Sequence, residues 1–146
     1  SEYNGKIPQD YSEFIKFKGV GPYIASAVLS IAFNKPLIAI DGNVNRVMSR
    51  YLSIDTNIKK SQKQTSQYLS QQINHSSAGN FNQAMMDLGR YICKPKLPQC
   101  THCPIQSNCS SYINNTTELY PVKLKTVKTP HYSIAVGIII KGNRLN

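Results

Sequence analysis

Residues 18–41 read KGVGPYIASAVLSIAFNKPLIAID, and this stretch decides the fold. Its two glycines, Gly19 and Gly21, stand one residue apart, and Pro22 after them suits the first turn of a helix. Apolar residues then recur at helical spacing until Asn34 and a second proline. The stretch therefore predicts a compact turn between two helices, the second of which is mostly buried.

Other parts of the chain also carry helical patterns. A capping pair, Asp10 and Glu13, precedes a first helix at Tyr11–Phe17, in which Phe14 and Phe17 share a face. The second helix is expected to bury a broad stripe made of Ile24, Val28 and Ile31 beside Ala25, Leu29 and Ala32. After it we expect a buried connector at 37–40, and then a helix entered at Asp41 with one apolar face made of Val44, Val47, Met48 and Tyr51. A surface helix is expected within 61–77, anchored by Leu69 and Ile73. A last helix is expected to be capped by Asn80 and to place Phe81, Met85 and Leu88 in one seam beside Ala84 and Ile92. Met85 and Met86 are expected in the core.

The charge balance indicates a polyanionic partner. The 146 residues include 17 Lys and Arg against 7 Asp and Glu, a net charge of +10. In a chain of one-domain length this excess favours nucleic acid, although an acidic membrane surface or simple solubility would also accommodate it. No apolar run is long enough to span a bilayer, and no leader peptide is visible. The apolar run after His131 resembles a strand that stops early, so we expect a piece of a longer chain.

The glycine turn is a candidate site for an anion. Its glycines allow close approach of the backbone, and the first turn of the following helix offers N–H donors without helical partners. Phosphate oxygens fit such donors, which makes Lys18, Gly19, Val20 and Gly21 candidate DNA-binding residues. An ordinary helix end with a capping glycine remains the alternative.

All cysteines of the chain lie in one segment, at Cys93, Cys100, Cys103 and Cys109. The C-x6-C-x2-C-x5-C spacing suits four thiolates around one inorganic centre, either an iron–sulfur cluster or tetrahedral zinc. A disulfide is the weaker alternative, because nothing else in the sequence indicates an oxidising compartment.

Positive charge surrounds the cysteine segment. Lys94 and Lys96 lie in it, Arg90 precedes it, and no carboxylate occurs from Leu88 to Thr117. These cations would present positive potential to a phosphate backbone, although simple solvation of each lysine is the alternative. The histidines, His75, His102 and His131, are expected at the surface.

A carboxylate, Asp41, follows the apolar LIAI segment and precedes Gly42 and Asn43. An aspartate at such a helix entrance often serves as an N-cap. The positive helix N-terminus also keeps a carboxylate ionised. The local sequence therefore favours a helix cap, and a cap of this kind could also keep an ionised carboxylate for another role.

The segments KGVGPYIASAVLSIAF and AIDGNVNRVMSRY resemble the helix-hairpin-helix and catalytic-aspartate segments of the HhH-GPD DNA glycosylases, and above all those of the adenine DNA glycosylase (MutY) family. The similarity runs from about Gly5 to Pro121. It implies an all-α helix-hairpin-helix glycosylase core with a C-terminal four-cysteine iron–sulfur loop. On this basis residues 1–92 are part of the helical domain, 93–121 are the cluster loop and tail, and 122–146 are a linker and the start of a truncated domain.

The resemblance also implies roles for individual residues. Asp41 would stabilise a cation-like sugar as the base leaves, Asn43 would orient the sugar or a water, and the four cysteines would hold a [4Fe-4S] cluster. Tyr23 stands where endonuclease III has the lysine that forms a Schiff base, which implies base removal without strand cleavage. The family's general acid is a glutamate that would precede Ser1, so the 146-residue chain alone is expected to be inactive.

The implied substrate is double-stranded DNA with a mismatch, adenine opposite oxidised guanine or guanine. The target base would be extruded from the duplex before hydrolysis. The expected protein is a monomer that acts in the cytoplasm and makes no membrane contact. An endonuclease III-like glycosylase and lyase, and a DNA-binding scaffold without activity, remain the alternatives.

Overall fold

The computed structural model describes residues 3, 5–56, 58–122, 134, 140–141 and 144–145. Its helices are α1 (Tyr11–Phe14), α2 (Pro22–Phe33), α3 (Gly42–Tyr51), α4 (Ile58–Gln72), α5 (Ala78–Asp87), the π-helical turn η1 (Leu88–Ile92) that continues α5, and α6 (Ser110–Ile113). Single 3-10 turns lie at η2 (Cys100–His102), η3 (Gln106–Asn108) and η4 (Thr117–Leu119). Within the ranges described, the strands are β1 (Ile140–Lys141) and β2 (Arg144–Leu145), which pair antiparallel. The predicted helical core is confirmed, since the described residues up to 122 form helices and loops and the two short strands lie beyond them.

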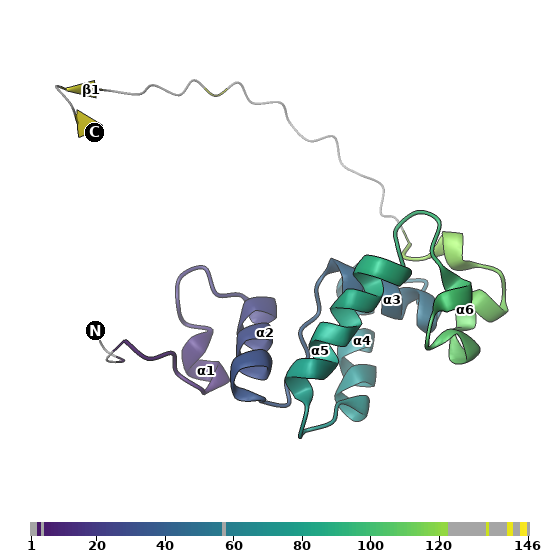
Figure 1. Ribbon diagram of the computed structural model, residues 1–146, viewed down its shortest axis with the longest axis horizontal. Helices are drawn as coiled ribbons and strands as arrows, with labels where there is room; N and C mark the ends of the chain where they lie inside the picture. Colours follow the sequence, from purple (N-terminus) through teal and green to yellow (C-terminus); the bar gives the residue numbers. More distant parts are fainter. Residues whose placement is uncertain are drawn as a thin grey trace.

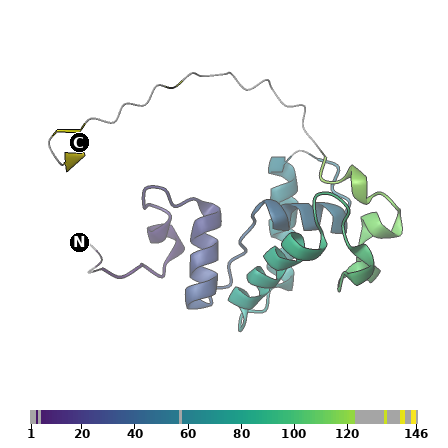
Figure 2. The same ribbon diagram turned by 45° about the horizontal axis from the view of Figure 1, so that its top comes forward.

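The helices follow one another in a row (Figures 1 and 2). α1 and α2 lie at one end, α3, α4 and α5 in the middle, and α6 with the cysteine segment at the other end. α2 packs on α5, whereas α3 contacts α4, α5, η1 and α6. α3 is therefore the helix on which α4, α5, η1 and α6 converge, and its first residues follow Asp41.

The first helix is shorter than predicted. The Asp10 carboxylate accepts a hydrogen bond from the Glu13 backbone N–H at 3.1 Å, so the predicted cap is confirmed. α1 nevertheless ends at Phe14, because successive tight turns, Phe17 N to Phe14 O and Val20 N to Phe17 O, lead the chain into the glycines. Phe14 is buried and Phe17 is 39% exposed, yet their rings lie 5.9 Å apart on one side, as predicted.

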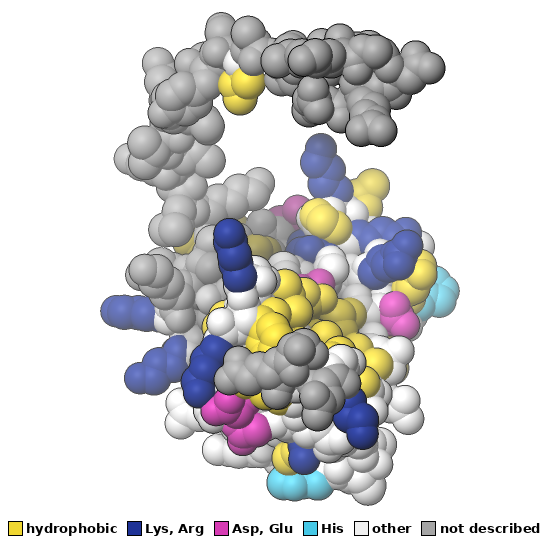
Figure 3. Space-filling model, turned by 90° about the vertical axis from the view of Figure 1, so that its left-hand side faces the viewer, with side chains coloured by type: hydrophobic (Ala, Val, Ile, Leu, Met, Phe, Trp, Pro, Cys, Tyr) yellow, Lys and Arg dark blue, Asp and Glu magenta, His cyan; other side chains and the backbone are white. Residues whose placement is uncertain are grey.

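α2 has the predicted bounds but a different buried face. Its buried residues are Ala25, Ser26, Leu29 and Ser30. The prediction of a mostly buried helix was wrong, because Ile24 and Ile31 are 41% and 47% exposed and Ala32 is exposed. α5 approaches α2 closely at Gly79, where an added Cβ would lie 2.8 Å from Ser30 O. Figure 3 shows hydrophobic side chains gathered on the face at the α1 and α2 end, with lysines and arginines around them.

A buried asparagine joins α5 to α2 and to the connector 37–40. Asn82 is 1% exposed and donates through Nδ2 to Ser30 Oγ at 2.8 Å and to Leu37 O at 2.7 Å. Its Oδ1 accepts from Ala39 N at 3.0 Å. Two of these bonds satisfy backbone groups of the connector, Leu37 O and Ala39 N, and the third joins α5 to the Ser30 side chain of α2. Together they set the path of the connector toward Asp41.

The second part of the core lies between α3, α4 and α5. Val44, Met48 and Leu69 are buried together, and Met85 and Met86 are half-buried against them, so both methionines contribute to the core. Other predicted core residues are half-buried against one of the two clusters: Val28 against Phe14, Ala25 and Leu29, and Tyr51 and Phe81 against Val44, Met48 and Leu69. Val47, Ile73 and Leu88 are buried, as predicted.

Two helix boundaries differ from the prediction. α4 spans Ile58–Gln72 rather than residues within 61–77, and it buries Ser61 and Thr65 as well as the predicted anchor Leu69. α5 begins at Ala78 rather than after Asn80, which is exposed inside the helix. The prediction failed because the cap comes from another helix: Asn34 at the end of α2 accepts through Oδ1 from Gly79 N at 3.4 Å.

His75 and His102 are exposed, as predicted. His131, the predicted linker and most of the predicted strand lie outside the described residues. Where the chain is described, no helix is both long and apolar enough to cross a membrane.

Candidate active site and cysteine segment

The Asp41 carboxylate is held by two hydrogen bonds at the entrance of α3. Oδ1 accepts from the Val44 backbone N–H at 2.7 Å, which makes Asp41 the N-cap, and Oδ2 accepts from Asn43 Nδ2 at 2.8 Å. The side chain is half-buried and lines a pocket of about 280 Å³. A fixed carboxylate that borders a cavity can stabilise a positive charge that develops there.

The pocket contains residues that sequence reasoning missed. Besides Asp41 and Asn43, α5 and η1 contribute the others, Gln83, Met86, Asp87 and Arg90. The helical spacing of these four residues was visible in the sequence, but nothing there showed that this face of α5 meets the start of α3. The predicted site residue Tyr23 reaches the pocket indirectly, because its hydroxyl lies 3.6 Å from Met86 Sδ.

A chain of hydrogen bonds links Asn43 to the cysteine segment through Arg46. Arg46 Nη2 donates to Asn43 Oδ1 at 2.9 Å and to Gly89 O at 2.7 Å, and Nε donates to Cys93 O at 2.9 Å. Burial lowers the pKa of the Arg46 guanidinium, while the charges of Cys93 and Asp41 raise it. The orientation of the amide beside the candidate carboxylate is thus set by a guanidinium on the next turn of α3.

η1 approaches the start of α3 so closely that only glycine fits. A Cβ on Gly89 would lie 2.7 Å from Asn43 Cβ and 3.0 Å from Asn43 O. Real Cβ atoms do not approach that closely, so a side chain at this position would displace Asn43 or η1. Gly89 therefore keeps Asn43 and Arg46 in register, a role that the sequence alone did not reveal.

The glycine turn lies between α1 and α2, as predicted. Gly19 has φ of +88°, in the left-handed region that favours glycine, and Gly21 is the N-cap of α2. Lys18 is exposed and Val20 is half-buried against Phe14, Ala25 and Leu29. None of these turn residues lines the Asp41 pocket, which is formed with α5 and η1 instead.

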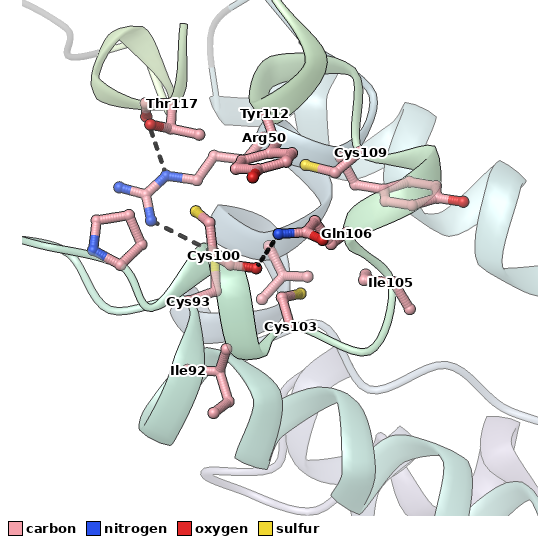
Figure 4. A pocket seen from close by; sticks show the side chains of 13 residues that line it. Arg50, Ile92, Cys93, Cys100, Cys103, Ile105, Gln106, Cys109, Tyr112 and Thr117 are labelled. Carbon is pink, nitrogen blue, oxygen red and sulfur yellow. Dashed lines mark hydrogen bonds between the residues drawn. The ribbon is translucent and has the colours of Figure 1, made fainter. Parts of the chain in front are cut away.

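The four cysteines line one common pocket (Figure 4). All four are half-buried free thiols, and apolar residues of the same pocket include Val47, Ile92 and Ile105. Burial raises the pKa of the Cys100 and Cys103 thiols, and the neighbouring cysteines raise it further. Among the described residues, no three His, Cys, Asp or Glu side chains are grouped so that they could hold a metal ion as they stand.

Arg50 fastens the cysteine segment to α3. The side chain is on the buried face and 3% exposed. It donates to backbone carbonyls on two segments, to Lys94 O at 2.7 Å and Pro95 O at 3.2 Å on one side and to Thr117 O at 3.1 Å and Tyr120 O at 3.0 Å on the other. Nη1 also donates to Cys93 Sγ at 3.3 Å. Sequence reasoning missed Arg50, because its role depends on carbonyls that lie more than 40 residues away in sequence.

The predicted cationic residues differ in exposure. Lys96 is exposed, whereas Lys94 is half-buried. The Arg90 guanidinium lies 5.2 Å from the ring centroid of Tyr91, a contact that holds this cation at the rim of the Asp41 pocket.

Known proteins resemble this chain in sequence and in structure. No established family profile matches it. An adenine DNA glycosylase from Buchnera aphidicola subsp. Baizongia pistaciae is 38% identical over 127 residues, which are 87% of this chain and 36% of that protein. Four further relatives with the same name are 36–41% identical. The chain spans between 22% and 40% of the length of these five relatives.

Two solved structures share the fold. A thermostable thymine-DNA glycosylase superposes with a TM-score of 0.70 at 28% identity, over 77% of this chain and 52% of that one. Endonuclease III, solved as a trapped covalent intermediate with DNA, superposes with a TM-score of 0.63 at 33% identity, over 78% of this chain and 53% of that one. The fold is therefore that of the helix-hairpin-helix DNA glycosylases. Within that class, the chain belongs to the adenine DNA glycosylase (MutY) family.

Proposed function

We propose that this chain carries the catalytic aspartate and a DNA-binding surface of a DNA glycosylase that hydrolyses the N-glycosidic bond of adenine opposite oxidised guanine or guanine. The observation that carries the proposal is the geometry of Asp41. Both of its carboxylate oxygens accept hydrogen bonds at 2.7 and 2.8 Å while the side chain borders a cavity. The adenine specificity is supported by the names of the relatives.

In the proposed reaction the bond between C1′ of the deoxyribose and N9 of adenine breaks, and water supplies a hydroxyl to C1′ and a proton to the base. The sugar passes through a cation-like state, which the ionised Asp41 stabilises. Asn43 orients the sugar or the water. Family resemblance assigns protonation of the base to a glutamate that would precede Ser1, so the reaction is assayed on the chain joined to that segment of a relative.

We propose base removal without strand cleavage, because the position of the Schiff-base lysine holds Tyr23. A phenol cannot form an imine, and the Tyr23 hydroxyl contacts the sulfur of Met86 instead. The test is borohydride trapping on duplexes with adenine opposite oxidised guanine. We expect adenine release without a covalent adduct. An adduct, or release of oxidised pyrimidines with adenine left in place, would support an endonuclease III-like lyase instead.

For DNA binding we propose two contacts with phosphates. Lys18, Gly19, Val20 and Gly21 would receive one phosphate at the start of α2, where the helix is twelve residues long and its first turn directs N–H donors outward. Lys94 and Lys96 would contact the backbone from the cysteine segment. Affinity for a mismatched duplex should then fall steeply with salt, with a slope of log K against log salt of roughly −0.9 for each phosphate neutralised.

Cys93, Cys100, Cys103 and Cys109 are proposed as the ligands of a [4Fe-4S] cluster. The donors fit in number and kind, since four thiols line one pocket with apolar walls and with the Arg50 guanidinium beside Cys93 Sγ. The thiols would have to move together around the cluster, because no three of them are grouped to hold a metal ion as they stand among the described residues. Such a cluster would supply structural cross-linking of the segment, and the Arg50 cation would compensate the negative charge of the thiolates. Iron content and visible absorption of the purified chain test the proposal. A colourless protein with one zinc per chain would support the alternative metal.

A further inference from the structure

The segment between Cys93 and Cys100 presents a leucine to solvent. Leu97 is 86% exposed, the largest fraction among the big apolar side chains of the described residues. Its backbone has φ of +49°, in the left-handed region that a leucine rarely adopts. Strained conformations of this kind persist only where the surrounding structure imposes them, and they concentrate at functional sites.

The base of this segment is held firmly. Arg50 donates to Lys94 O and Pro95 O, and Ile92 O accepts from both Lys94 N and Gln99 N at 2.9 Å. Pro95 and Pro98 restrict the backbone on either side of Leu97. The leucine therefore projects from a preorganised loop, and its ordering costs little additional entropy when it contacts a partner.

The surroundings of Leu97 define the chemistry of that partner. Lys96 is exposed next to it, Lys94 lies three residues before it, and no carboxylate occurs between Leu88 and Thr117. An apolar tip between cations fits a polyanion with an apolar interior. Duplex DNA has this character, since its phosphates flank stacked bases, and apolar wedges with nearby Lys or Arg are the usual means of entering the minor groove.

The same segment is connected to the Asp41 pocket. Arg46 donates to Cys93 O, at the start of the segment, and to Asn43 Oδ1, beside the carboxylate. The first residue of the segment and the amide beside the carboxylate are thus positioned by the same guanidinium. An anionic membrane has a similar combination of charge and apolar interior, but the solved endonuclease III of the same fold is bound to DNA.

We propose that Leu97 enters the minor groove of the bound duplex as an apolar wedge, with Lys94 and Lys96 on the flanking phosphates. This inference rests on the proposed function, because it requires that the chain bind duplex DNA. It predicts that the apolar part of the affinity and the ionic part can be separated by substitution. Substitution of Leu97 should change the affinity for the duplex without changing its salt dependence, and substitution of Lys96 should change both.

The test is Leu97→Asn in the 146-residue chain. Asparagine is of similar size and tolerates the left-handed region, so the variant should unfold at the same temperature as the wild type or a higher one. Binding to a duplex with adenine opposite oxidised guanine is measured by fluorescence anisotropy at several salt concentrations. We expect an affinity about tenfold weaker, as for partial loss of a buried leucine, with an unchanged salt slope. Leu97→Met should keep most of the affinity.

Two control variants separate the alternatives. Ile113→Asn changes another exposed apolar residue, 59% exposed in α6, and should leave the affinity unchanged. Lys96→Ala should reduce the magnitude of the salt slope by about 0.9. An unchanged affinity of Leu97→Asn would overturn the wedge and leave the proposed function intact, whereas a wild-type chain that binds no duplex would overturn both. Loss of binding to phosphatidylserine vesicles with intact DNA affinity would also overturn the wedge, in favour of a membrane contact.

Discussion

Replacing Arg50 with methionine should release the cysteine segment from α3. The guanidinium is 3% exposed and donates to four backbone carbonyls and to Cys93 Sγ. Methionine fills much of the space of the aliphatic stem but satisfies none of these acceptors. Both ends of the segment, at Lys94 and at Thr117, would lose their attachment to the same helix.

The size of the effect follows from these contacts. A hydrogen bond to a charged group contributes about 1.5–3 kcal/mol, and the cost of desolvating the guanidinium offsets part of the sum. Each carbonyl that stays buried without a donor costs about 1–3 kcal/mol, and the carbonyls that water reaches cost less. We therefore expect a loss of roughly 3 kcal/mol in the free energy of unfolding, which for a chain of this length lowers Tm by roughly 10 °C.

The assay is urea unfolding followed by circular dichroism, with trypsin cleavage after Lys96 as a local measurement. Arg50→Lys should recover little of the loss, since an ammonium cannot reach carbonyls on two segments at once. Arg90→Met is the matched control, because Arg90 is exposed and contacts the Tyr91 ring. The reasoning would be refuted if Arg50→Met and Arg90→Met had equal stabilities and equal rates of cleavage.

Three further predictions concern the fold and the site. Asn82→Ala leaves the buried Ala39 N–H and Leu37 O without their partner and should cost about 3 kcal/mol in urea unfolding, whereas Asn80→Ala, on the exposed face of α5, should be nearly neutral. Gly89→Ala should cost about 1–3 kcal/mol in urea unfolding and shift the side-chain amide resonances of Asn43. Gly42→Ala, with no atom within 4 Å of the added Cβ, should leave the stability and these side-chain resonances nearly unchanged. Hydrogen bonds from Lys16 and Tyr3 lower the pKa of Glu13 below its ordinary 4.5, and a hydrogen bond from Ser12 lowers the pKa of Asp10 below its ordinary 3.8. Because both carboxylates are stabilised in the folded state, their contribution to stability is fully present above pH 4.5 and should be lost as the pH falls through the lowered folded-state pKa values. Backbone NMR shifts of α1 that stay constant through this titration would contradict the third prediction.

The helices near the glycine turn were predictable because their signals are local. Pro22 begins α2 and Asn34 ends it, and Asp41 caps α3 through its own side chain, so each boundary is set by a neighbour in sequence. α5 was misplaced for the opposite reason. Its N-terminal N–H is capped by Asn34 from another helix, and no pattern within α5 itself records this.

The candidate site was predicted in part. Asp41 and Asn43 lie together because adjacent residues of one helix start must do so, and the family resemblance indicated both. Arg46, Arg50 and Gly89 were missed because their roles depend on which helices meet: each contacts a segment about 40 residues or more away in sequence. The exposure of Ile24 and Ile31 was missed for a related reason, since periodicity shows a helix face but not what covers it.

The most direct test of the account is Asp41→Asn in the chain joined to the relative's segment that carries the general acid. The amide oxygen can still accept a hydrogen bond from Val44 N, so the fold should be retained. The dissociation constant for the mismatched duplex should remain within about twofold of the wild-type value. Loss of the negative charge should slow adenine release by at least about a hundredfold in single-turnover assays. Adenine release at the wild-type rate by this variant would contradict the proposal that Asp41 stabilises the cation-like sugar.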